Sequence, residues 1–141
     1  AYPERNRLRA GEWGRCADGK PRNDTMYTVV QERDLRTGRS KTATLEGKDH
    51  MSGVSFFHVN NEPGQGPEVH THPYSETFIV LSGEAVITVD GEEIEARKGD
   101  IVVAGAGAPH RFRNSGSGGL DIMCIHASPR FETEWLDETL A

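Results

Sequence analysis

The sequence predicts an all-β protein, a sandwich or barrel of short strands, and three observations support this. Short runs of apolar or alternating residues recur along the 141 residues, separated by Gly, Pro, Asn, Asp and Ser. No helical apolar period lies between these runs. Asp90-Gly91 joins two of them as a two-residue hairpin, because both central positions of such a turn need positive φ. Strands at this spacing are typical of sandwiches and barrels.

The expected strands follow one another from residue 27 to residue 126. They are 27–31, 54–59, 76–81, 85–89, 93–96, 101–104, 110–113 and 120–126. Gly83, Gly99-Asp100 and 116–119 supply further turns.

The short C-terminal extension has two open interpretations. Ser128-Pro129 could cap a helix that carries Phe131, Trp135 and Leu140 on one side. The alternation of Phe131, Thr133 and Trp135 fits a strand equally well. In both cases the aromatic residues are expected to close one end of the barrel or to form a subunit contact.

The chain is expected to consist of an N-terminal segment, 1–25, and one domain, 26–141. The segment is rich in Arg and Gly and has no apolar period. A flexible arm, a leader left from cloning and a strand lent to a partner subunit all fit it. The remainder is long enough for a single core. No internal repeat or second domain is recognisable.

Charge and hydropathy exclude two classes of partner. The formal net charge of −6 argues against nucleic acid. No apolar stretch approaches the roughly 20 residues that a membrane span requires. Cys16 and Cys124 do not form a metal-type spacing or a disulfide framework, and the apolar run 122–125 predicts that Cys124 is a buried thiol. We expect a cytoplasmic protein.

A metal site is indicated by two stretches of the sequence. His70 and His72 are two apart on an expected strand, so their side chains share one face, roughly 6.5 Å apart along it. Glu76 opens the next strand with an oxygen ligand, and Pro109 precedes His110 at the start of another. Three imidazoles and one carboxylate suit a divalent transition metal and leave one or two coordination positions open. Taken alone, these residues are also compatible with a polar strand surface.

The two stretches resemble the paired motifs of the cupin superfamily. The first motif is Gly, five residues, His-x-His, three or four residues, Glu, six residues, Gly. Gly64, His70, His72, Glu76 and Gly83 match it at every position. The second motif is Gly, five residues, Pro-x-Gly, two residues, His, three residues, Asn. Gly99, Gly107, His110 and Asn114 match it, and Gly105 stands where the family has proline.

The resemblance implies a cupin jelly-roll β-barrel, usually dimeric, that holds one metal ion inside. The implied ligands are His70, His72, Glu76 and His110, and the ion could be iron, manganese, nickel, cobalt or zinc. Glu76 is the only candidate catalytic residue.

Several other residues are weighed as secondary candidates. His50 follows Lys48-Asp49 in a polar loop and is expected to be solvated. His58 and His126 lie in expected strands, and each could face the cavity or the solvent, because strand register cannot be read from sequence. Tyr74 and Ser75 flank Glu76 and either orient it or shape the turn.

The expected charge of the cavity indicates which class of substrate it would bind. Arg111 and Arg113 alternate out of phase with His110 and Phe112, so both are expected to point away from the cavity. A cavity without positive charge favours a small neutral, partly apolar, enol-like substrate.

Three functions fit these residues. The first is a metal-dependent dioxygenase of the non-heme iron type. The second is non-redox catalysis by an isomerase, a lyase or a polyketide-type cyclase, with the ion as a Lewis acid. The third is a small-molecule-binding protein without catalysis. The fold alone does not rank them.

Overall fold

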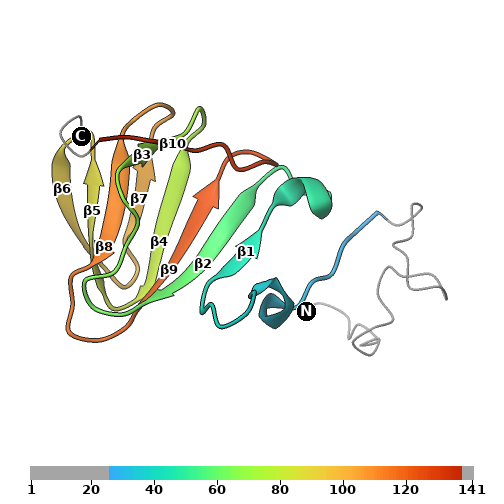
Figure 1. Cartoon of the computed structure of the whole chain (residues 1–141), viewed down its shortest axis with the longest axis horizontal. Helices are drawn as coiled ribbons and strands as arrows, with labels where there is room; N and C mark the ends of the chain where they lie inside the picture. Colours follow the sequence, from blue (N-terminus) through green and yellow to red (C-terminus); the bar gives the residue numbers. More distant parts are fainter. Residues whose placement is uncertain (1–25, 138–141) are drawn as a thin grey trace, which may run out of the picture. The chain divides into compact units, whose positions relative to one another are not determined.

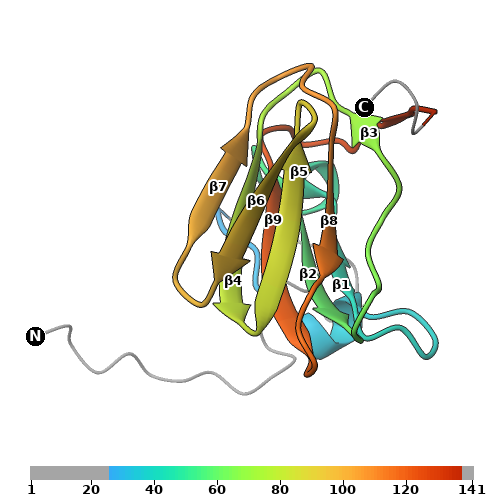
Figure 2. The ribbon, with the colours of Figure 1, turned by 90° about the vertical axis from the view of Figure 1, so that its left-hand side faces the viewer.

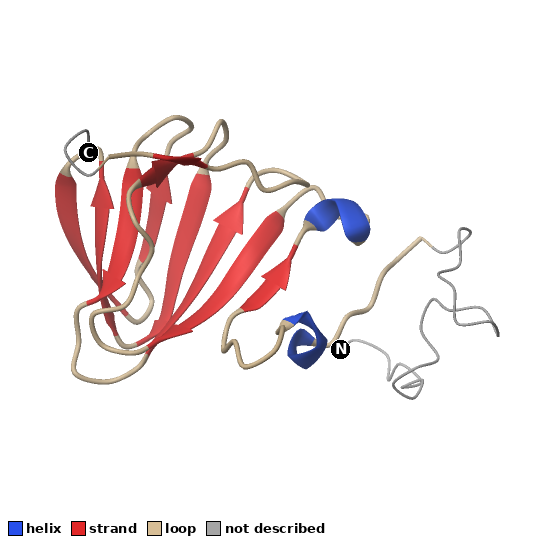
Figure 3. Cartoon of the chain, viewed as in Figure 1, coloured by secondary structure: helices blue, strands red, loops and turns tan. Residues whose placement is uncertain are grey.

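The computed structural model describes residues 26–137 and consists almost entirely of β-strands (Figure 3). The elements in chain order are η1 (Glu32–Leu35), β1 (Ala43–Leu45), η2 (Gly47–Asp49), β2 (Ser55–Asn61), β3 (His70–Thr71), β4 (Glu76–Ser82), β5 (Glu84–Val89), β6 (Glu92–Arg97), β7 (Ile101–Ala104), β8 (His110–Asn114), β9 (Leu120–His126) and β10 (Glu134–Trp135). The two η elements are single 3₁₀ turns. None of the helical turns in the described part of the chain is long and apolar enough to cross a membrane.

The contact pattern divides the chain into two units, Ala1–Gln31 and Glu32–Ala141. All strands belong to the second unit. The predicted segment 1–25, with Cys16, and Leu140 lie outside the described residues.

The strands form two five-stranded antiparallel sheets. The first has the order β1-β2-β9-β4-β7 and the second the order β10-β3-β8-β5-β6 (Figure 1). Figure 2 shows the second sheet in front, with β9 and β2 behind it. This pair of sheets confirms the predicted all-β jelly roll.

The core lies between the two sheets and follows the period-two pattern of the strands. Phe78 and Val80 of β4 meet Leu120, Ile122 and Cys124 of β9, and all five are at most 1% exposed. Every second residue of β9 is buried, because only one face of that strand meets the facing sheet. Burial raises the pKa of the Cys124 thiol well above its usual value, so it is protonated as predicted for a buried thiol.

The hairpin turn predicted at Asp90-Gly91 is present. Both residues have positive φ, 53° and 81°, and β5 pairs with β6 on either side of them. At Gly66, glycine is required because a side chain would clash with neighbouring backbone, and not because of the backbone angles. A Cβ at Gly66 would lie 1.9 Å from the carbonyl oxygen of Phe112, so only glycine lets the 62–69 loop run against β8.

One expected strand is absent from the structure, one open alternative is decided, and two short strands were not expected as such. The strand expected at 27–31 is irregular, and Tyr27 and Val29 are exposed, because strand propensity without a buried face does not specify a strand. The C-terminal extension contains no helix in its described part. Its last strand, β10, pairs with β3. The two-residue strand β3 and the three-residue β1 are too short to show a period in the sequence.

Candidate metal centre

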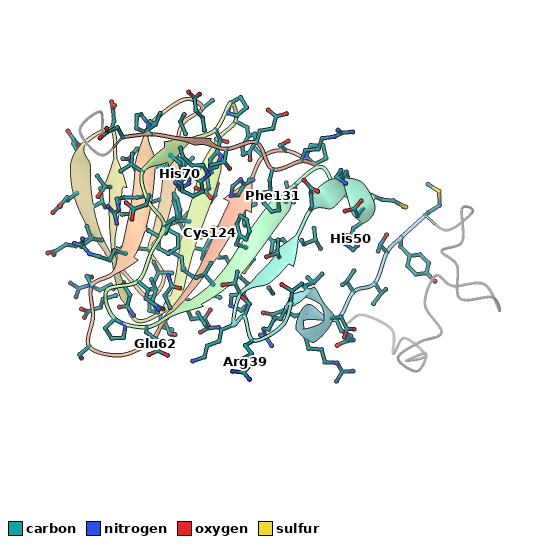
Figure 4. All side chains as sticks on the ribbon, in the orientation of Figure 1. Arg39, His50, Glu62, His70, Cys124 and Phe131 are labelled. Carbon is teal, nitrogen blue, oxygen red and sulfur yellow. The ribbon has the colours of Figure 1, made fainter. Side chains whose placement is uncertain are left out.

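The four predicted ligands come together at one end of the space between the sheets. His70 and His110 are direct partners in the β3–β8 pair, so their side chains leave the sheet on the same face. Glu76 begins β4 in the facing sheet, and His72 follows β3. One ligand atom from each of these four buried residues lies within 4.8 Å of the other three. Figure 4 shows His70 among the side chains between the strands, above Cys124.

Backbone carbonyls orient all three imidazoles in the same way. Each ring donates a hydrogen bond from Nδ1 to a carbonyl oxygen. The acceptors are Glu68 for His70 (2.7 Å), Glu132 for His72 (2.7 Å) and Ala108 for His110 (2.9 Å). Because a carbonyl oxygen can only accept, the proton sits on Nδ1 and each Nε2 keeps its lone pair. This is the form in which histidine binds a metal.

The inward-facing atoms have no partner of their own. Nε2 of His72, Nε2 of His110 and Oε2 of Glu76 are buried and form no hydrogen bond. Glu76 Oε2 lies 2.7 Å from His110 Nε2 and 3.8 Å from His72 Nε2. Lone pairs that face each other in a buried space repel unless positive charge lies between them. The donor set therefore fits a divalent transition metal ion.

The pKa shifts agree with this donor set. Burial lowers the pKa of His70, and it lowers the pKa of His72 to about 4, so both rings are neutral near pH 7. Burial raises the pKa of Glu76, but the facing His110 and His126 outweigh it and hold the pKa at about 2. Burial lowers the pKa of His110 too, and there the facing Glu76 outweighs it, so the net direction is upward. A buried anion thus faces two neutral imidazoles, His70 and His72, and stabilises the protonated form of a third, His110.

His126 is the site residue whose direction the sequence left open. It ends β9, is 2% exposed, and lies opposite Glu76 in the β4–β9 pair. Its Nε2 lies 2.5 Å from Glu76 Oε1, and its Nδ1 is 2.7 Å from the hydroxyl of Tyr74. Tyr74 therefore contacts the site through His126 and by stacking on His72, with ring centres 5.0 Å apart, rather than through Glu76. Inward-facing Ile122 and Cys124 on the same strand were the signal that could have placed His126 inside.

The other secondary candidates lie outside the centre. His58 points to the outer face of its sheet, where its ring contacts Glu32 and Asp121. His50 is half-buried beyond η2, and Figure 4 shows it away from His70. Ser75 contributes its carbonyl to the backbone of Ala127, which is a structural role.

A pocket of about 640 Å³ opens onto three of the four ligands, His70, His72 and Glu76. Its apolar wall includes Phe57, Val59, Phe112 and Trp135, and its polar wall includes Gln65 and Arg111. A pocket of this size accommodates a drug-sized molecule, and its mixed lining suits a flat, partly apolar molecule with a few polar groups.

The expectation that no positive charge lines the cavity is wrong for Arg111. Arg111 is among the residues that line the pocket, and its guanidinium lies 3.8 Å from the carboxylate of Glu68. Arg111 is out of phase with His110, but the 62–69 loop, rather than a strand, covers this edge of β8. A long side chain can therefore curl over the edge toward Glu68. Arg113 is exposed and does not line the pocket, as predicted.

Comparison with known proteins agrees with the motifs. The family model described as "Cupin domain" matches residues 57–126, which contain both motifs and β9. Polyketide synthase CurC of Streptomyces cyaneus is 37% identical over 97 residues, 68% of this chain and 59% of that protein. Tetracenomycin polyketide synthase protein TcmJ of Streptomyces glaucescens is 31% identical over 84 residues, 58% of this chain and 56% of that protein. The matches thus span little more than half the length of these relatives.

The fold recurs in a solved structure. Oxalate decarboxylase from Lactobacillus farciminis superposes with a TM-score of 0.65 at 23% identity, covering 74% of this chain and 34% of that chain. With the jelly roll, the two motifs and the family match on residues 57–126, the chain belongs to the cupin superfamily.

Proposed function

We propose that this chain is a metal-dependent enzyme that acts on an enolisable, partly aromatic substrate of the polyketide type. The observation that carries this proposal is a buried set of three imidazoles and one carboxylate at the end of a pocket of about 640 Å³. The two Streptomyces relatives named as polyketide synthase proteins support the substrate class.

In this proposal His70, His72, Glu76 and His110 hold one divalent ion among iron, manganese, nickel, cobalt and zinc. A bound ion supplies Lewis-acid activation of a substrate oxygen. Glu76, the predicted catalytic residue, contributes as a ligand.

The pocket walls supply binding and orientation. Phe57, Phe112 and Trp135 offer flat apolar surface to a ring system. Arg111 offers its guanidinium to an acidic oxygen such as an enolate, a phenolate or a carboxylate. The substrate is therefore proposed to carry such an oxygen.

A dioxygenase acting on the same substrate is the second candidate. Four protein ligands leave one or two coordination positions open, which is room for dioxygen beside an enol. The apolar pocket wall favours this reaction as well, because it excludes water from a reactive intermediate.

The test compares the protein loaded with zinc and, anaerobically, with ferrous iron. Each form is incubated with 1,3-diketones and polycyclic phenolic ketones, and products and oxygen uptake are measured. Metal-dependent conversion without oxygen uptake supports the first candidate, and stoichiometric uptake with iron supports the second. If both metal forms bind these compounds but convert none of them, both candidates are contradicted. The function that then fits is a small-molecule-binding protein without catalysis.

The ligand assignment is tested separately. His72→Ala and Glu76→Ala are each expected to lose the bound metal, whereas His58→Gln, on the outer face of the sheet, is expected to retain it. Metal content that survives both alanine substitutions would show that the assignment is wrong.

A further inference from the structure

His126 is enclosed by aromatic rings on the side of Glu76 that faces β2. Phe57 packs against it edge-on with ring centres 5.5 Å apart, and Phe131 packs against it at 5.0 Å and 89°. The ring is buried, yet both of its nitrogens meet polar atoms, Glu76 Oε1 at 2.5 Å and the Tyr74 hydroxyl at 2.7 Å. Nε2 nevertheless forms no hydrogen bond in this structure, and an unpaired nitrogen in such surroundings is costly, so a specific role is expected for the ring.

The hydrogen bonds of Tyr74 determine which nitrogen of His126 carries the proton. The backbone N–H of Glu132 donates to the Tyr74 oxygen at 3.1 Å. In the arrangement in which the hydroxyl of Tyr74 donates to Nδ1 of His126, the proton of neutral His126 sits on Nε2. This tautomer is the opposite of that in His70, His72 and His110, whose Nδ1 atoms donate to carbonyls.

The tautomer makes His126 a donor toward Glu76. Its Nε2 is 2.5 Å from Oε1, whereas the other oxygen, Oε2, faces His110 and His72. Nε2 of His126 forms no hydrogen bond in this structure although Oε1 lies 2.5 Å away, so the donation proposed below requires a change in the relative orientation of the two groups. The group of four ligand atoms within 4.8 Å of one another does not include His126.

The peptide unit of Glu132 links both parts of this arrangement. Its N–H holds Tyr74, and its carbonyl accepts Nδ1–H of His72. The backbone of this single residue of the C-terminal extension therefore orients a proposed ligand and the partner of His126 together.

We propose that His126 is a positioning residue of the metal centre, which holds Oε1 of Glu76 through an Nε2–H that the Tyr74 hydroxyl specifies, so that Glu76 binds the ion through Oε2. The proposal deepens the proposed function and rests on the metal site named there.

The first test measures the tautomer directly. Long-range ¹H–¹⁵N correlation spectra of the protein labelled with ¹⁵N-histidine are recorded without metal and with zinc. We expect a protonated Nε2 and an unprotonated Nδ1 for His126 in both states, and the reverse for the three ligands in the zinc form. A protonated Nδ1, or a zinc-bound Nε2, on His126 would overturn the proposal.

Tyr74→Phe removes one hydroxyl and is expected to give a mixture of His126 tautomers. An unchanged His126 spectrum would contradict the role of Tyr74.

The second test separates positioning from packing by zinc affinity, measured in competition with a chromophoric chelator. His126→Leu keeps the apolar volume but removes the donor, and it is expected to weaken zinc binding about 10- to 100-fold. His126→Gln retains an N–H donor and is expected to recover part of that loss. A packing role predicts the reverse order, because leucine suits the space between Phe57 and Phe131 better than glutamine.

His58→Gln is the matched control, since it removes a histidine from the outer face of the neighbouring strand, and it is expected to bind zinc like the wild type. Wild-type affinity in His126→Leu would show that the proposal is wrong. Should that variant fail to fold, the Tyr74→Phe spectrum still decides. Neither readout depends on turnover, so absence of catalysis would contradict the proposed function without affecting this result.

Discussion

His58 has a structural role and lies outside the metal centre, because its side chain points to the outer face of its strand. It lies on the outer face of β2, where its ring bridges Glu32 of η1 and Asp121 of β9. The β1 residue opposite it is the apolar Ala43, and Arg36 pairs with Glu32 at 3.2 Å. Burial lowers the pKa of His58, but the two carboxylates outweigh it and the net direction is upward from 6.5. His58 therefore joins η1 to the sheet most strongly when it is protonated.

The raised pKa predicts a pH-dependent contribution to stability. A group with a raised pKa in the folded state stabilises fully below its unfolded pKa, and this contribution is lost as pH rises through the folded pKa. The free energy of unfolding of the wild type should therefore exceed that of His58→Gln below pH 6.5, and the difference should shrink above it. Urea unfolding of both proteins between pH 5.5 and 9 measures this. A difference that grows with pH would contradict the assignment.

Gly66 is a second residue whose role is local. An alanine Cβ would meet the carbonyl oxygen of Phe112 at 1.9 Å, so Gly66→Ala must displace the loop that forms one wall of the pocket. We expect this substitution to cost about 1–3 kcal/mol of unfolding free energy, as overpacking does. Gly118→Ala is the control, because nothing lies within 4 Å of its Cβ, and it should change stability by less than about 0.5 kcal/mol. Equal effects in the two variants would show that the loop is not tightly packed on β8.

At the scale of elements, the C-terminal extension is part of the site. Phe131 stacks on Phe57 with ring centres 4.4 Å apart, and its backbone N–H donates to Glu46 at 3.0 Å. Two short strands, β3 and β10, then pair with each other, and Leu136 donates to Val69 at 3.0 Å. These contacts hold the peptide of Glu132 against the ligands.

Phe131→Ala tests this role of the extension. Because Phe131 is only half-buried, we expect a loss of about 1–3 kcal/mol, less than the 3–5 typical of a fully buried phenylalanine. Zinc affinity should fall as well, because Glu132 loses its anchor. Glu134→Ala, an exposed residue of the same extension, should leave both stability and affinity unchanged. Wild-type zinc affinity in Phe131→Ala would mean that the extension does not support the centre.

At the scale of the whole molecule, the homodimer implied by the family resemblance stays a prediction. The outer side of the β7 edge offers apolar surface for it, because Ile101 and Val103 are 62% and 58% exposed. Light scattering should then give about twice the mass of the 15.5 kDa chain. Val103→Glu should shift the mass toward a monomer, since it would bury a charge in the contact. Thr44→Glu, on the opposite edge strand β1, should not. A wild-type mass of one chain would contradict the prediction.

The sequence by itself determined the parts of this protein that rest on local rules. The seven strands from β2 to β9 other than β3 carry enough alternation to be located within two residues, and the Asp90-Gly91 turn follows from backbone angles alone. The four candidate ligands were readable because their spacing matches two motifs at every ligand position, and each motif lies within about twenty residues of chain.

Tertiary structure alone decided what depends on contacts between distant segments. The inward direction of His126 and the outward direction of His58 follow from the pairing of β2 and β4 with β9, and register is a property of the sheet. Arg111 reached the pocket because a loop, not a strand, covers the edge of β8. The Glu132 peptide joined the ligands because the extension folds back onto β3. In each case the partner lies tens of residues away, and no local pattern encodes such a contact.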